Sequence, residues 1–216
     1  MHVRADLTEA ALLTPDAWEW VDSPQAGVRR VMLDRVGDEV AVATSLVRYA
    51  PESRFPRHDH ARGEEFIVLE GEFADEHGRY PPGTYVRNPP GTHHAPFSDP
   101  GCLIWVKLRQ FHADDLEQMV LALDAEIPAE GQRTRVLHEF ADERVAEITA
   151  AEGEAVLLPA AERAQEVLVL EGRVRSNGRP LEPMSWLRVP AGESGSLVTE
   201  APSRLFWKLR PETNWD

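Results

Sequence analysis

The chain has 216 residues, with 37 acidic and 23 basic side chains and a net charge of -14 at pH 7. Such a charge would repel a phosphate backbone, so we expect no binding to nucleic acid. The first fifteen residues contain no apolar run of signal-peptide length, and no later stretch approaches the roughly 18 apolar residues that a membrane span needs. We therefore expect a soluble cytoplasmic protein that does not bind a membrane.

Short strands separated by turns are the elements that the sequence predicts. Residues 40–49 are rich in β-branched side chains and end before a proline, and residues 64–69 end at a Glu-Gly turn. Turns rich in proline and glycine follow at residues 81–83, 88–91 and 99–101. Because the 17 prolines at such positions would break long helices, the pattern indicates an all-β fold.

The segment over residues 114–124 permits two interpretations. Leu116, Met119, Val120 and Leu123 fit the apolar stripe of a helix, whereas every second residue from Met119 to Leu123 is apolar, as in a strand. Both interpretations remain open at this point.

The apolar run at residues 66–69 does not alternate with polar residues, which indicates that both faces of that strand are covered. One face would line a barrel or sandwich. The opposite face, which carries Ile67 and Leu69, would pack on the other half of the chain or on a second subunit. A homodimer is therefore one of the two arrangements that we expect.

The chain repeats itself at an offset of 101 residues. Three segments recur without an insertion: residues 69–71 at 170–172, residues 86–91 at 187–192, and residues 107–109 at 208–210. A repeat of this length predicts two domains, each long enough to bury its own core. We place an N-terminal domain at residues 1–112, a linker at 113–130 and a C-terminal domain at 131–216.

Candidate metal ligands occur in the first copy of the repeat and not in the second. His58, His60, Glu64 and His94 stand where the second copy has Pro159, Ala161, Gln165 and Gly195. Side chains at positions i and i+2 of a strand point the same way, so the first two histidines can reach one ion, and the glutamate keeps that parity after a turn. Three imidazoles and a carboxylate suit Zn, Fe, Mn, Ni or Cu. We therefore predict one divalent metal ion in the first copy.

Sulfur ligands are excluded by composition. Cys102 is the only cysteine, so the chain forms no intrachain disulfide and no cysteine-rich zinc module. Other polar side chains near the predicted ligands have structural interpretations. His93 and Glu65 each adjoin a predicted ligand and should face the opposite side of their strands. Glu166 stands in the second copy where Glu65 stands in the first, which favours a shared structural role, and we expect His77 in an exposed turn.

The predicted ligands resemble the first sequence motif of the cupins, G-x5-H-x-H-x3,4-E-x6-G. His58, His60, Glu64 and Gly71 match this motif at its spacing, and Glu52 replaces the opening glycine. The departure affects a turn rather than a ligand.

The second cupin motif, G-x5-P-x-G-x2-H-x3-N, is matched by Gly83, Pro89, Gly91 and His94, with Ser98 in place of the closing asparagine. The resemblance covers about residues 50–109. It implies two tandem cupin β-barrels of the jelly-roll type, the second a degenerate copy, with the ion inside the first barrel.

Residues 55–102 are similar, more narrowly, to the cupin domain of ChrR, a zinc-dependent anti-sigma factor that answers oxidative stress. This resemblance implies a regulatory or sensory module that binds one divalent metal ion, with zinc favoured and iron, manganese or nickel as alternatives. The anti-sigma domain of ChrR carries its own histidine and cysteine zinc ligands. Residues 1–30 of this chain contain His2 as their only histidine and no cysteine, which argues against binding to a sigma factor.

The alternative function is a mononuclear non-haem iron or manganese dioxygenase that acts on a small carbonyl compound, because cupins with three histidines and a glutamate often have that activity. A sensor implies closed coordination with little room for a substrate. An enzyme implies one or two open positions at the ion and a small-molecule ligand in the N-terminal barrel. The spacing of residues identifies no second acid-base group, and this is compatible with either function.

Overall fold

The structure, a computed structural model, describes residues 1–38 and 40–212. Strands are its main regular element, and its one helix is a single 3-10 turn at Pro15–Ala17, termed η1. The expected all-β fold is confirmed. No helix in the described ranges has the length and apolar character that crossing a membrane requires.

The chain forms two compact units. The N-terminal lobe comprises residues 1–5 and 19–124, and the C-terminal lobe comprises residues 6–18 and 125–212. This division differs from the boundaries predicted above, because the segment 6–18 belongs to the C-terminal lobe. The predicted end of the second domain, residues 213–216, lies outside the described residues.

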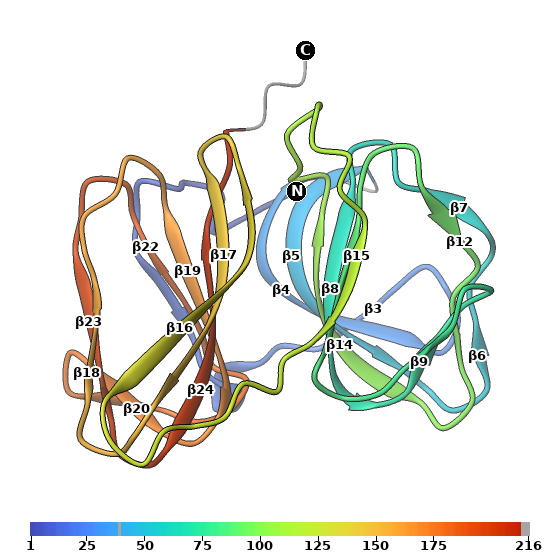
Figure 1. Cartoon of the computed structure of the whole chain (residues 1–216). Helices are drawn as coiled ribbons and strands as arrows, with labels where there is room; N and C mark the ends of the chain where they lie inside the picture. Colours follow the sequence, from blue (N-terminus) through green and yellow to red (C-terminus); the bar gives the residue numbers. More distant parts are fainter. Residues whose placement is uncertain (39, 213–216) are drawn as a thin grey trace. The chain divides into compact units, whose positions relative to one another are not determined.

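The N-terminal lobe contains an eight-stranded antiparallel sheet in the order β1-β4-β5-β14-β8-β11-β15, with β3 added beside β4, together with the sheets β10-β9-β13-β6 and β12-β7 (Figure 1). Its strands are β1 (His2–Val3), β3 (Val21–Asp22), β4 (Val28–Gly37), β5 (Ala41–Tyr49), β6 (Ser53–Arg54), β7 (His58–Asp59), β8 (Glu64–Gly71), β9 (Phe73–Ala74), β10 (Arg79–Tyr80), β11 (Thr84–Asn88), β12 (His93–His94), β13 (Phe97–Ser98), β14 (Cys102–Leu108) and β15 (Met119–Ala122).

One face of the large sheet lines the interior of this lobe. Across β4, β5, β14 and β8 the register places Arg30, Val47, Ile104 and Val68 in one row. The last three belong to, or pack against, a buried apolar cluster that also contains Phe66 and residues of the smaller sheet. Because residues opposite one another in an antiparallel sheet share a face, Arg30 lies on the lining face as well.

The segment that the sequence left ambiguous is a strand where it is regular. β15 pairs with β11 at the edge of the large sheet, with Tyr85 opposite Leu121 and Arg87 opposite Met119. Burial alternates along it, since Met119 and Leu121 are half-buried while Val120 and Ala122 are exposed. The strand alternation therefore describes this segment, and the helical stripe does not.

The C-terminal lobe contains the sheets β16-β17-β24-β19-β22-β2 and β18-β23-β20-β21. Its strands are β2 (Ala11–Leu13), β16 (Gln132–Phe140), β17 (Glu143–Ala150), β18 (Ala155–Leu158), β19 (Gln165–Glu171), β20 (Val174–Ser176), β21 (Arg179–Leu181), β22 (Trp186–Val189), β23 (Gly195–Thr199) and β24 (Ser203–Leu209).

Strand register repeats between the lobes at the offset found in the sequence. Glu64 lies opposite Leu108 in the N-terminal lobe, and Gln165 lies opposite Leu209 in the C-terminal lobe. Each of these strand pairs also contains a β-bulge at the equivalent place. The two lobes are therefore copies of one barrel, as the repeat predicted. β2 supplies for the C-terminal lobe the edge strand that β15 supplies for the other.

Candidate metal centre

The four predicted ligands come from three short segments at one end of the N-terminal barrel. β7 pairs with β12 so that His94 lies directly opposite His58. His60 follows β7, and its backbone N–H donates to the carbonyl of Thr92 at 2.8 Å, which holds it against the same partner segment. Glu64 is the first residue of β8. The chain thus delivers two histidines before a turn, the glutamate after it, and the third histidine from across the ladder.

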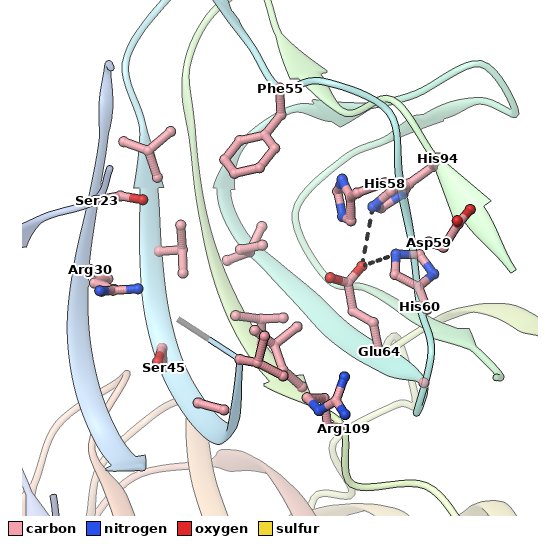
Figure 2. Close-up of a pocket in the computed structure, with 18 of the residues that line it drawn as sticks. Ser23, Arg30, Ser45, Phe55, His58, Asp59, His60, Glu64, His94 and Arg109 are labelled. Carbon is pink, nitrogen blue, oxygen red and sulfur yellow. Dashed lines mark ion pairs between the residues drawn. The ribbon is translucent and has the colours of Figure 1, made fainter. Parts of the chain in front are cut away.

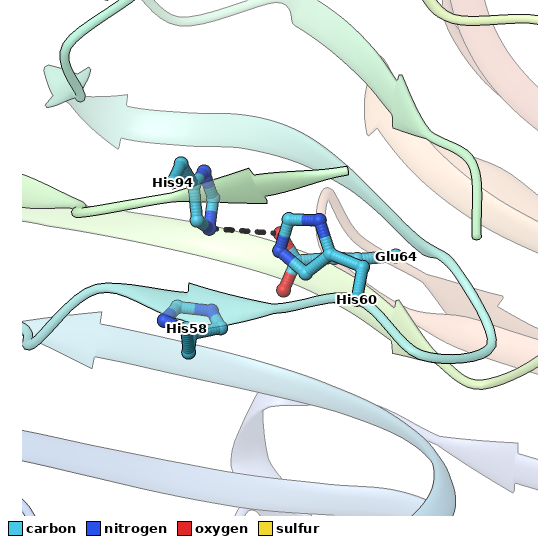
Figure 3. Close-up of side chains that lie close together, drawn as sticks. All are labelled: His58, His60, Glu64 and His94. Carbon is cyan, nitrogen blue, oxygen red and sulfur yellow. Dashed lines mark ion pairs between the residues drawn. The ribbon is translucent and has the colours of Figure 1, made fainter. Parts of the chain in front are cut away.

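Side chains of these four residues converge on one point, as Figure 3 shows. One ligand atom from each residue can be chosen so that all of these atoms lie within 4.8 Å of one another. The Oε1 atom of Glu64 lies 3.4 Å from Nε2 of His60 and 3.3 Å from Nε2 of His94. His60, Glu64 and His94 are buried, and His58 is half-buried.

Thr92 determines how His60 presents its ring. The Thr92 hydroxyl donates to the carbonyl of Pro89 at 2.7 Å, so its oxygen is left to accept from Nδ1 of His60 at 2.9 Å. Nδ1 therefore carries the proton, and Nε2 presents a lone pair to the centre. This buried Nε2 makes no hydrogen bond within the described residues. Two acceptors, Nε2 and the Glu64 oxygen, then face each other, an arrangement that a cation between them would stabilise.

His94 is oriented by Asp75. Its Nδ1 lies 3.2 Å from Oδ2 of Asp75, while Oδ1 of the same carboxylate accepts from Tyr80 Oη at 3.1 Å. Backbone N–H groups of His77 and Gly78 also donate to Oδ1, at 2.8 and 3.0 Å. A carboxylate held in this way directs the Nδ1 proton outward and leaves Nε2 of His94 for an ion.

Protonation of the centre follows from burial and from these partners. Burial lowers the pKa of His60 to about 4 against the opposing charge of Glu64, so this imidazole is neutral at neutral pH. Burial also acts to lower the pKa of His94, but the hydrogen bond to Asp75 and the charge of Glu64 outweigh it and raise that pKa. Burial acts to raise the pKa of Asp75, and the hydrogen bonds from His94 and the His77 backbone bring it below its ordinary value.

The turn between His60 and Glu64 depends on Gly63. Its φ of +75° lies in the left-handed region, and a Cβ atom there would come within 2.4 Å of the Phe111 ring. Phe111 is itself held under the Arg87 guanidinium, which lies 4.2 Å from the ring centroid. The tight turn and the packing against it are therefore both needed to place the glutamate four residues after the second histidine of the motif.

Other polar residues considered from the sequence lie outside this cluster. His93 pairs with Asp59 in the β7-β12 ladder, and its ring lies 6.5 Å from that of His77 rather than among the four converging side chains. His77 is an exposed residue in a bend, as expected. Glu52, which replaces the opening motif glycine, has a φ of +63° within a turn, so it adopts the conformation that a glycine would favour.

Glu65 belongs to a buried polar network on the other face of β8. Its Oε2 accepts from Tyr85 Oη at 2.5 Å and pairs with Arg87 at 3.1 Å. In the C-terminal lobe the equivalent Glu166 pairs with Arg210 at 2.5 Å and accepts from Trp186 Nε1 at 3.3 Å. Each of the two glutamates is buried and forms an ion pair with an arginine of its own lobe, which agrees with a shared structural role.

The equivalent position in the C-terminal lobe carries uncharged side chains. Gln165 occupies the place of the glutamate, and its amide donates to the carbonyl of Pro159 at 2.7 Å and accepts from Trp207 Nε1 at 3.1 Å. Its hydrogen bonds are thus made within the lobe. An apolar core that includes Val167, Leu187 and Leu197 fills the interior around it.

A cavity of about 390 Å³ adjoins the candidate metal centre within the N-terminal lobe. Apolar side chains such as Val47, Phe55 and Ile104 line it together with the four predicted ligands. Figure 2 shows Arg30 and Ser45 on the wall across from the histidines, and Arg109 beside Glu64. The arrangement can hold an ion with a small molecule next to it.

Sequence reasoning missed the two residues that orient the histidines. Asp75 lies 19 residues before His94, and Thr92 lies 32 residues after His60, so no local periodicity connects either pair. Thr92 is the residue after Gly91 of the second motif, and a hydroxyl at that place was the only signal in the sequence that could have indicated it. Asp75 carried no comparable signal.

Comparisons with known proteins agree with this geometry. Residues 8–112 match the model of the ChrR cupin-like domain family. No curated protein sequence matches the chain.

Solved structures share the fold at low sequence identity. A protein from Nostoc punctiforme with a provisional assignment as a dioxygenase is 12% identical, with a TM-score of 0.74, over 96% of this chain and 85% of that chain. The pirin YhhW of Escherichia coli, in complex with nickel(II), is 15% identical, with a TM-score of 0.69, over 94% of this chain and 99% of that one. A variant of oxalate decarboxylase from Bacillus subtilis is 12% identical, with a TM-score of 0.62, over 94% and 77%.

At these identities the structural likeness shows the fold alone. The family match, the two sequence motifs and the barrel that carries them agree: residues 8–112 match the ChrR cupin-like domain family, and the described chain has the fold of cupin structures.

Proposed function

We propose that the N-terminal lobe binds one divalent metal ion through His58, His60, Glu64 and His94. The observation that carries this proposal is the convergence of their ligand atoms within 4.8 Å, with a buried, unbonded Nε2 of His60 facing the glutamate. Zinc, iron, manganese and nickel all accept three imidazole nitrogens and one carboxylate oxygen. The Glu64 charge would offset part of the charge of such an ion.

The cavity beside the centre favours a function in which a small molecule binds next to the ion. A closed structural site would leave little space there, whereas this cavity has a volume of about 390 Å³. We therefore favour a mononuclear metal enzyme of the dioxygenase class, acting on a small carbonyl compound. A bound ion would supply Lewis-acid polarisation of a substrate oxygen.

The roles of the chain's own residues follow from their contacts. Thr92 and Asp75 keep the protons of His60 and His94 on Nδ1, away from the centre. Apolar walls that include Phe55 and Ile104 would exclude bulk water from a bound substrate. No further carboxylate or imidazole needs to move a proton in this scheme.

A regulatory or sensory module with zinc is the second candidate. The match of residues 8–112 to the ChrR cupin-like family supports it. In this function the cavity would hold the molecule whose presence is sensed.

Metal analysis of protein purified without an affinity tag tests both candidates. Stoichiometric zinc would support the sensory module, and iron or manganese would support the enzyme. Absence of bound metal after loading with zinc, iron(II), manganese(II) and nickel(II) in turn would contradict both. Oxygen uptake by the iron-loaded protein in the presence of small diketones separates the two functions further, since the sensory module should show none.

A double replacement of His58 and His60 by alanine locates the site. We expect it to abolish metal binding and to leave the fold intact, because neither side chain belongs to the buried apolar cluster of the lobe. Replacement of His77 and His93 by alanine is the matched control, since their rings lie outside the converging set. Equal metal content in both double variants would show that the site is elsewhere.

A further inference from the structure

In the part of the chain that the structure describes, the guanidinium of Arg30 is an unpaired charge on a largely apolar cavity wall. It lies on the lining face of β4, in one row with Val47 and Ile104, and it borders the cavity beside the candidate metal centre. Its Nε atom is buried and has no hydrogen-bond partner among the described residues. A buried donor of this kind costs free energy unless a ligand or solvent satisfies it.

Arg109 borders the same cavity from the other side of Glu64, as Figure 2 shows. Its φ is +63°, and its backbone N–H donates to the carbonyl of Gly63 at 2.9 Å, so its position is tied to the turn of the metal centre. Within the described part of the chain, the Arg109 side chain makes no ion pair and no hydrogen bond.

Other arginines of this lobe form ion pairs with nearby acidic residues. Arg48 pairs with Glu70 at 3.0 Å, and Arg54 pairs with Asp99 at 2.7 Å. In a chain with 37 acidic and 23 basic side chains, acceptors are plentiful. Two guanidinium groups without such a partner on the wall of one cavity are therefore better explained by a ligand that brings its own negative charge.

We propose that the cavity binds an organic carboxylate, whose carboxylate group is held by Arg30 and whose opposite end lies at the metal centre, where Arg109 lies beside Glu64. The inference rests on the proposed function, because it specifies the chemical class of the molecule that lies next to the ion. Apolar side chains such as Val28, Val47 and Ile104 separate Arg30 from the histidines along the wall, which fits a ligand with a hydrocarbon middle. The volume of about 390 Å³ is at the lower end for small-molecule sites and indicates a small ligand.

Calorimetric titration of the zinc-loaded protein with a series of dicarboxylates from malonate to adipate tests the inference. We expect at least one member to bind in a 1:1 ratio and its uncharged diamide to bind far more weakly. Arg30→Met should lower the affinity for the dicarboxylate by about 10- to 100-fold, as expected for the loss of charged hydrogen bonds. Arg109→Met should lower it by a smaller factor.

Arg29→Met is the matched control. Arg29 precedes Arg30 on β4 but is exposed and pairs with Asp22, so its replacement should leave dicarboxylate affinity unchanged. Inorganic phosphate is titrated as a second probe. Binding of phosphate that depends on Arg30, without binding of any dicarboxylate, would overturn the assignment to a carboxylate.

Metal content measured on the same samples keeps the two proposals apart. Arg30→Met should retain the full complement of zinc, because Arg30 is not a ligand. If the wild-type protein holds metal but binds every dicarboxylate as well as the Arg30→Met variant does, the inference is wrong and the metal site stands. If the protein holds no metal, the proposed function fails, and the same titration of the metal-free protein decides the inference, since the contact with Arg30 does not require the ion.

Discussion

Replacement of Asp75 by asparagine tests the orientation of His94 without removing a ligand. Oδ1 of Asp75 accepts from two backbone N–H groups and from Tyr80, whereas Oδ2 alone contacts Nδ1 of His94 at 3.2 Å. Asparagine can keep its oxygen in the first role. Its NH₂ group then faces His94 and donates to Nδ1, which transfers the imidazole proton to Nε2. The nitrogen that faces the centre would no longer offer a lone pair.

The expected loss of metal affinity follows from the role of Asp75, which contacts a metal-binding histidine and not the ion itself. Removal of a carboxylate that orients a metal-binding histidine lowers metal affinity by about 10- to 100-fold, or about 1.4 to 2.8 kcal/mol. The loss should be smaller than that of His94→Ala, which removes the nitrogen itself. The stability of the metal-free protein should change little, because the three hydrogen bonds to Oδ1 persist.

Competition with a chromophoric chelator measures the zinc affinity of the wild-type protein and of the Asp75→Asn variant, and thermal unfolding of both metal-free proteins checks the fold. Asp99→Asn is the matched control, because Asp99 is an exposed carboxylate of the same lobe that pairs with Arg54. The reasoning is refuted if Asp75→Asn binds zinc as tightly as wild type while His94→Ala does not.

Three further predictions concern the turn, the metal and the buried thiol. Gly63→Ala should lower the free energy of unfolding by about 2 to 4 kcal/mol, because of the left-handed backbone and the clash with Phe111. Gly91→Ala is the control: Gly91 has a φ of +88° and open space around it, so the substitution should lower the free energy of unfolding by only about 1 kcal/mol. Equal shifts of the unfolding temperature in the two variants would contradict this. Chelation of the metal should lower the unfolding temperature, and added zinc should restore it, by up to about 4 kcal/mol at a thousandfold excess over Kd; no shift would argue against a bound ion. Burial raises the pKa of Cys102 from 9.0 to about 11, against a hydrogen bond with Ser98 that lowers it. The Cys102 thiol should therefore react with iodoacetamide at pH 8.5 much more slowly in the native protein than in the unfolded chain. Because the unfolded chain loses this proton first, stability should fall as pH rises from 9 to 11, and Cys102→Ala should reduce that fall.

Strand parity and turn chemistry made much of the centre predictable. The convergence of His58, His60 and Glu64 depends only on backbone geometry over seven residues. The prolines and glycines before His94 indicate the turns that precede it. The repeat likewise predicted the equivalent register of the two lobes, because identical spacing between strands imposes identical pairing. Such features are local, or they copy a local feature at a constant offset.

Contacts between distant segments were decided only by the tertiary structure. The sequence could not show that residues 11–13 would complete the sheet of the C-terminal lobe, because an edge strand can pair with any exposed edge of suitable register. It could not assign residues 119–122 to a strand, since the segment fits two periodicities and only its pairing with β11 decides between them.

The same distinction holds for the chemistry of the centre. The amino-acid sequence by itself determined an all-β fold with four candidate ligands in its first half, because those ligands lie in short motifs whose geometry the backbone dictates. Asp75 behind His94, Thr92 behind His60 and Arg30 across the cavity became visible only when the barrel closed. Hydrogen bonds and cavities depend on which side chains meet in space, and the separation of two residues along the chain does not indicate whether they meet.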